Sequence, residues 1–65
     1  MNYHIWRNRV SFLADEAFKE IEKKVEECIK IYCIENRVFD PEDILEIFAD
    51  SFQDMSRKID EKYYS

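Results

Sequence analysis

Glycine is absent from this sequence of 65 residues, and proline and histidine occur once each. Because glycine supplies the positive φ angles of tight turns and phosphate-binding loops, its absence excludes glycine-rich nucleotide motifs. The one histidine, His4, does not combine with Cys28 and Cys33 in a zinc-ligand spacing, and no Glu-x-x-His pattern occurs. A lone histidine and four scattered serines give no paired nucleophile and base. We therefore expect no metal, no cofactor and no enzymatic activity.

Long hydrophobic runs and secretion signals are also missing. No stretch of 18 apolar residues occurs, which excludes a membrane-spanning helix. The first ten residues lead into neither an apolar segment nor a small-residue cleavage site, so no signal peptide is predicted. Cys28 and Cys33 would lie on different sides of a helix, and a disulfide between them is not expected. We expect a cytoplasmic protein.

The composition indicates a source as well as a location. The chain is rich in Ile, Lys, Glu, Phe and Tyr and poor in Ala, which is typical of AT-rich coding DNA in low-GC bacteria and their phages. A phage-encoded chain would work in the cytoplasm of the host cell.

Positive charge is scarce, since the chain has ten Lys and Arg residues but fifteen Asp and Glu residues, for a formal net charge of −5. Residues 35–54 alone contain seven acids and one base, Arg37. Direct binding of nucleic acid needs clustered Lys and Arg and is therefore disfavoured. A protein with a basic surface is the more natural partner.

One interruption divides an otherwise helix-compatible chain. Asp40 suits a helix N-cap, Pro41 suits the first helical position, and the acids that follow favour the positive end of the helix dipole. The sequence predicts one small domain, residues 1–65, with a helix at about 3–35, a hinge at 36–40 and a helix at about 41–62. A second possibility is that Ser11 caps a later start, which would leave the first ten residues as an arm or a short third helix.

Hydrophobic periodicity gives each predicted helix one apolar side. At about 100° per residue, the first helix gathers Trp6, Val10, Leu13, Ala14, Ala17, Phe18, Ile21, Val25, Cys28, Ile29, Ile31 and Tyr32 within about 80° of Ile21. The second helix gathers Ile44, Leu45, Phe48, Phe52, Met55, Ile59, Lys62 and Tyr63 within about 60° of Phe48. We name these sets the first and second apolar stripes.

The two stripes predict an all-α, antiparallel two-helix hairpin. The expected core residues are Ile21, Val25, Cys28, Phe48, Phe52 and Met55. Two helices cover only one side of each other, so the hairpin is completed either as a dimeric four-helix bundle or by docking on another protein.

Four carboxylates recur every four residues on the second helix, and we name them the acidic row: Glu42, Glu46, Asp50 and Asp54. Like charges at this spacing cost a few tenths of a kcal/mol per pair, so local helix stability does not explain the row. It is either a solvated face or a surface that engages basic residues of a partner.

Aromatic residues make up 15% of the chain, more than a two-helix seam requires. Tyr3, Trp6 and Phe12 lie near Arg7 and Arg9, and Trp, Tyr and Arg are enriched in interface hot spots. These three aromatics either anchor a partner or fill and cap a dimer core.

Residues 56–60, Ser-Arg-Lys-Ile-Asp, resemble the Ser-x-x-Leu-Asp signature of small helical-hairpin phosphatases that act on sporulation response regulators in bacilli. Ser56 and Asp60 match outright, whereas the interior Gln and acid of the signature are replaced by Arg and Lys. The segment between Pro41 and the motif is also longer than in that family. The resemblance implies regulation through a protein partner, with Asp60 near the phosphoaspartate of a response regulator.

Together these features predict a small acidic protein-binding regulator or inhibitor that occludes a basic surface of its partner. The alternatives are a structural homodimeric bundle module, a small subunit of a larger complex, or a hairpin protein directed at a response regulator.

Overall fold

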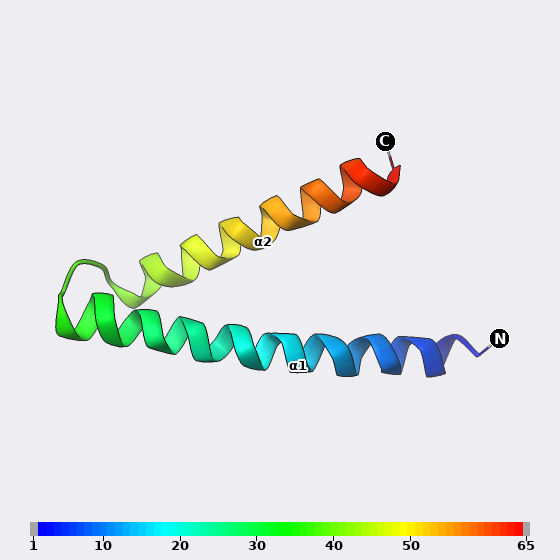
Figure 1. Cartoon of the computed structure of the whole chain (residues 1–65), viewed down its shortest axis with the longest axis horizontal. Coiled ribbons are helices and arrows are strands. Elements are labelled where there is room, and N and C mark those ends of the chain that lie inside the picture. Colours follow the sequence, from blue (N-terminus) through cyan, green and yellow to red (C-terminus); the bar gives the residue numbers. More distant parts are fainter. Residues whose placement is uncertain (1, 65) are drawn as a thin grey trace.

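The computed structural model describes residues 2–64, which form two long helices joined by a short connection (Figure 1). Helix α1 spans Tyr3–Ile29, a π-helix, η1, continues it over Lys30–Glu35, and α2 spans Pro41–Tyr64. No strand occurs within residues 2–64. The predicted all-α two-helix hairpin is confirmed.

Helix α1 is capped by Asn2, which the sequence analysis did not single out. The Asn2 side-chain oxygen accepts a hydrogen bond of 3.0 Å from the backbone N–H of His4, as an N-cap does. The helix then continues through Ser11 without interruption. The alternative of a separate arm or third helix ending at Ser11 is therefore wrong. Trp6 and Val10 share the phase of the later stripe because they belong to the same helix.

The end of the first helical segment is wider than a regular α-helix. The Ile31 carbonyl accepts from the backbone N–H of Asn36, five residues later, at 3.1 Å, and from the Asn36 side-chain amide at 2.7 Å. Bonds to the fifth residue define a π-helix, and they replace the regular α-helical end predicted near residue 35. The Asn36 side chain thus helps to satisfy a carbonyl that the end of the helix would leave free.

A left-handed residue then turns the chain. Arg37 has a φ of 53°, in the region that glycine adopts without steric cost. The Tyr32 carbonyl closes this turn by accepting from the amides of Val38 at 2.8 Å and Phe39 at 3.0 Å. The chain therefore reverses direction without a glycine.

Helix α2 starts at Pro41, as the sequence predicted, and ends two residues beyond the expected end. At this start the accepting carboxylate belongs to Asp43 and not to Asp40, the expected N-cap residue. The Asp43 carboxylate accepts from the backbone N–H of Asp40 at 3.0 Å. The Asp40 carbonyl in turn accepts from the amide of Asp43 at 3.0 Å. This is the backward-reaching half of a capping box, with Asp43 in the third helical position.

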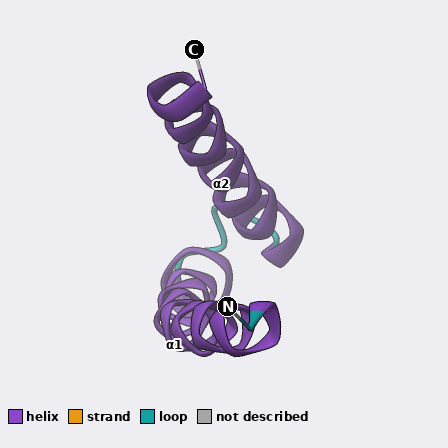
Figure 2. Cartoon of the chain, turned by 90° about the vertical axis from the view of Figure 1, so that its right-hand side faces the viewer, coloured by secondary structure: helices purple, strands orange, loops and turns teal. Residues whose placement is uncertain are grey.

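The two helices diverge from the hinge, so the hairpin is an open V (Figure 1). The end-on view shows α2 leaning away from α1 toward its C-terminal end (Figure 2). The radius of gyration is 15.8 Å, whereas a compact chain of this length has about 11 Å. The open shape leaves the helices in contact mainly at the closed end of the V.

Only one residue, Ile44, is buried among those the structure describes, with 4% of its surface exposed. The predicted core is therefore wrong as a buried set: Val25, Cys28 and Phe48 are half-buried, whereas Ile21, Phe52 and Met55 are exposed. The physical reason is the divergence of the helices, which separates the stripes. They still meet at the Phe18 and Phe52 rings, whose centroids are 6.1 Å apart.

Candidate functional site

The acidic row runs along the side of α2 that faces away from its apolar stripe. All four carboxylate residues are exposed. Each step of four residues advances about 6 Å along the helix and about 40° around it, so Glu46 and Asp50 lie about 160° from Phe48. The row is therefore a slightly winding line of charge on the outer side of the V.

Most of this charge has no counter-ion within the hairpin. Asp54 pairs with Arg57 at 3.3 Å, and both side chains are about two-thirds exposed. Among residues 2–64, Glu42, Glu46 and Asp50 form no ion pair. An exposed ion pair contributes about 0–1 kcal/mol, so even Asp54 remains available to an outside cation.

The three predicted aromatic anchors are exposed, by 68% for Tyr3, 50% for Trp6 and 63% for Phe12. Tyr3 packs edge-on against the His4 ring at 5.9 Å, and the Arg9 guanidinium lies 5.2 Å from the centre of the Trp6 ring. These contacts are local to the first turns of α1. They hold the rings at the open end of the V.

The aromatic anchors do not form one patch with each other or with the acidic row. Phe12 lies about 120° around α1 from Trp6, and it borders a shallow groove with Asp15, Glu16, Phe18, Lys19 and Glu22. Tyr3 and Trp6 instead continue the first apolar stripe. The predicted site residues are therefore distributed over three surfaces.

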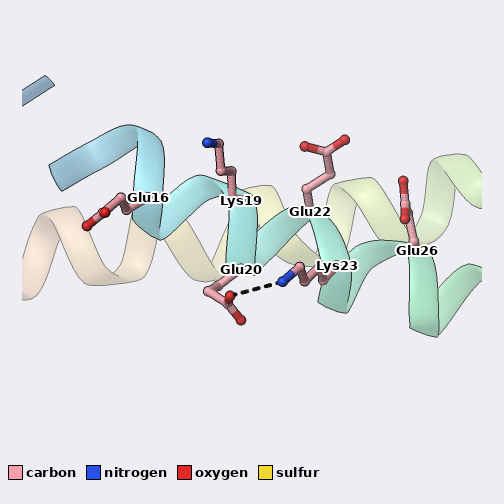
Figure 3. A pocket seen from close by; sticks show the side chains of 6 residues that line it. All are labelled: Glu16, Lys19, Glu20, Glu22, Lys23 and Glu26. Atoms are coloured by element: carbon pink, nitrogen blue, oxygen red, sulfur yellow. Dashed lines mark hydrogen bonds and ion pairs between the residues drawn. The ribbon is translucent and has the colours of Figure 1, made fainter. Parts of the chain in front are cut away.

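The outer side of α1 carries a second charged surface, drawn in Figure 3. Its six residues are Glu16, Lys19, Glu20, Glu22, Lys23 and Glu26. Glu20 and Lys23 pair at 3.4 Å, and Lys24 beside them pairs with Glu27 at 3.6 Å. All six residues come from one helix, so this surface is a furrow between side chains and not an enclosed pocket.

Cys33 lies in η1 next to the hinge, and the pKa of its thiol is raised. Desolvation raises the pKa of the Cys33 thiol, and the charges of Asp40 and Asp43 and the nearby Cys28 raise it further. Both cysteines are free thiols. A raised pKa keeps the thiol protonated at neutral pH, where it is a weak nucleophile and a weak metal ligand.

No group of three His, Cys, Asp or Glu side chains within residues 2–64 is arranged to hold a metal ion. Within the same range, neither helix is long and apolar enough to cross a bilayer.

The chain matches no family model, no curated protein and no solved structure. The similarity to the sporulation phosphatases rests on residues 56–60, which lie exposed in the C-terminal half of α2.

The sequence analysis noted Arg7 beside the aromatic anchors but missed its position within the first apolar stripe. Arg7 lies about 20° around α1 from Phe18 and about 40° from Ile21, so a cation interrupts the first apolar stripe. It forms no ion pair with any residue between 2 and 64. The helical phase that assigned Trp6 to the stripe could have identified Arg7 in the same way.

Proposed function

We propose that this chain is a protein-binding regulator that uses the acidic row on α2 to occlude a basic surface of another protein. The observation that supports this function is the exposure of Glu42, Glu46 and Asp50 without a cation partner among residues 2–64. The row costs the helix stability through repulsion, and a cationic partner would reverse that cost. Its charge also speeds the encounter with such a partner.

The mechanism is steric and electrostatic occlusion. Carboxylates repeated about 6 Å apart on a rigid helix present a line of negative charge to the Lys and Arg residues of a groove that holds phosphates. A partner held in this way cannot bind nucleic acid at the same time.

The test is a double charge reversal, Glu46→Lys with Asp50→Lys. The immobilised wild-type chain is used to capture a partner from a cell extract, the partner is identified, and its affinity is then measured with purified components. We expect the reversal to weaken binding by about tenfold or more while circular dichroism shows unchanged helicity. Raising salt from about 50 to about 500 mM should weaken wild-type binding as well.

A matched control separates the row from net charge alone. Glu16→Lys with Glu22→Lys changes the charge by the same amount on the outer side of α1. The control should retain the partner. Equal loss in both double variants, or full binding by the variant in the row, would refute the proposed role of the acidic row.

A second function, a structural bundle module or a subunit of a larger complex, is favoured by a different observation. Both apolar stripes carry large side chains that are about half exposed, including Phe18, Phe52, Met55 and Ile59. Those surfaces lie on the inner side of the V and are separate from the acidic row. The chain can therefore use one surface for assembly and the other for regulation.

A further inference from the structure

The single chain exposes far more surface than a compact protein of its mass. Its accessible surface is 6226 Å² for 8.0 kDa, whereas a compact monomer of that mass exposes about 4,450 Å². The excess is about 1,800 Å². Stable homodimers bury about 1,000–2,500 Å² per subunit, so the excess matches what one dimer interface removes from each chain.

Closing the V would not cover the whole first apolar stripe. The α1 and η1 segments have 27 and 6 residues against 24 in α2, an overhang of nine residues or about 13 Å. Figure 1 shows the N-terminal end of α1 reaching past the end of α2. The overhang carries Trp6 and Val10, which α2 of the same chain cannot cover.

The two ends of the V have opposite charge. Residues 3–13, in and next to the overhang, contain Arg7 and Arg9 and no acid. Residues 35–46, at the closed end, contain five acids and one base. An arrangement that sets the closed end of one chain beside the overhang of another joins opposite charges. The reverse arrangement sets like charges together and is disfavoured.

Arg7 sharpens this preference because it lies within the first apolar stripe and not on the polar side. A cation covered by a second chain must find an anion, or its desolvation opposes association. Single polar residues in apolar seams are known to fix the register and orientation of helix pairs. In the head-to-tail arrangement the closed end of a second copy would bring Glu35 and Asp40, both exposed, toward that position.

We infer that two copies of this chain pair head to tail through their apolar stripes, with the hinge of each copy covering the overhang of the other and its acids facing Arg7. The dimer is a four-helix bundle with hinges at opposite ends. The acidic rows remain on the outside, so the inference is independent of the proposed regulatory function.

The first experiment measures mass and orientation in the purified protein, without any partner. Sedimentation between about 1 and about 500 µM should show a concentration-dependent approach to twice the 8.0 kDa chain mass. For orientation, one spin label is placed by Asn8→Cys in a chain that also carries Cys28→Ala and Cys33→Ser. Head-to-tail pairing predicts a label separation of about 35 Å or more, and side-by-side pairing predicts less than about 25 Å.

The second experiment tests the charge complementarity. Arg7→Glu should weaken dimerisation by about tenfold or more, whereas Lys19→Glu, on the outer side of α1 in Figure 3, should change it by less than about twofold. Both substitutions lie in α1 and change the net charge by the same amount.

Three results would overturn the inference. A chain that stays monomeric over the whole concentration range would mean that the apolar stripes are covered by another protein or by closure of the V. A short label separation would give the opposite orientation. Equal effects of the two charge variants would remove Arg7 from the interface.

Discussion

Arg37 occupies a backbone conformation that an arginine adopts only under constraint. Its φ of 53° places it in the left-handed region, where a side chain with a Cβ costs about 1 kcal/mol relative to glycine. We expect Arg37→Gly to raise the free energy of unfolding by about 0.5–1 kcal/mol, measured by urea denaturation. Arg37→Val, with a β-branched side chain, should lower it. Greater stability of the valine variant than of the glycine variant would contradict the assignment.

Individual residues also show where sequence reasoning succeeds and where it stops. Asp40 and Pro41 identified the start of α2 because their preferences are strong and local. Nothing local marks Arg37 as left-handed, since arginine has no preference for that region. The π-helical end and the turn after it depend on hydrogen bonds to the Ile31 and Tyr32 carbonyls, whose donors lie five to seven residues further along the chain.

At the scale of the helices, Ile44 is the residue that holds α2 to the closed end of the V. Ile44→Ala should cost about 2–5 kcal/mol, as much as the whole stability of a domain of this size, about 3–5 kcal/mol. Ile47→Ala is a matched control, because Ile47 lies in the same helix but is 49% exposed. We expect its cost to be below about 1 kcal/mol, and thermal melting followed by circular dichroism measures both. Similar melting of the two variants would show that burial at the hinge is not the main contact.

The helix phases could be predicted from the sequence, but the distance between the helices could not. Periodicity placed Phe18 and Phe52 on the stripes, and the structure brings their rings together. The same periodicity predicted a buried Ile21 and Met55, which are exposed. Phase determines the direction a side chain faces and says nothing of the angle at which two helices leave a hinge. The acidic row needed only phase, so the sequence located it on the correct helix and side.

The whole molecule combines a stiff closed end with two long, sparsely supported arms. Its extents are 51 × 27 × 13 Å, and the buried residue, the capping bond between Asp40 and Asp43 and the left-handed turn all lie near the hinge. Toward the open end the helices depend mainly on their own backbone hydrogen bonds, whereas most helical stability in proteins comes from tertiary packing. Stability should therefore fall with distance from the hinge in the single chain.

Amide hydrogen exchange measures that gradient directly. In dilute solution, where the chain is single, we expect residues 3–13 and 55–64 to exchange at least about tenfold faster than residues 25–32 and 44–52, because local opening costs least where few apolar contacts form. At high concentration, a second chain on the overhang should slow exchange in residues 3–13 first. Residues near the C-terminal end of α2 serve as the internal reference. Uniform exchange along both helices at low concentration would mean that the open ends are as stable as the hinge.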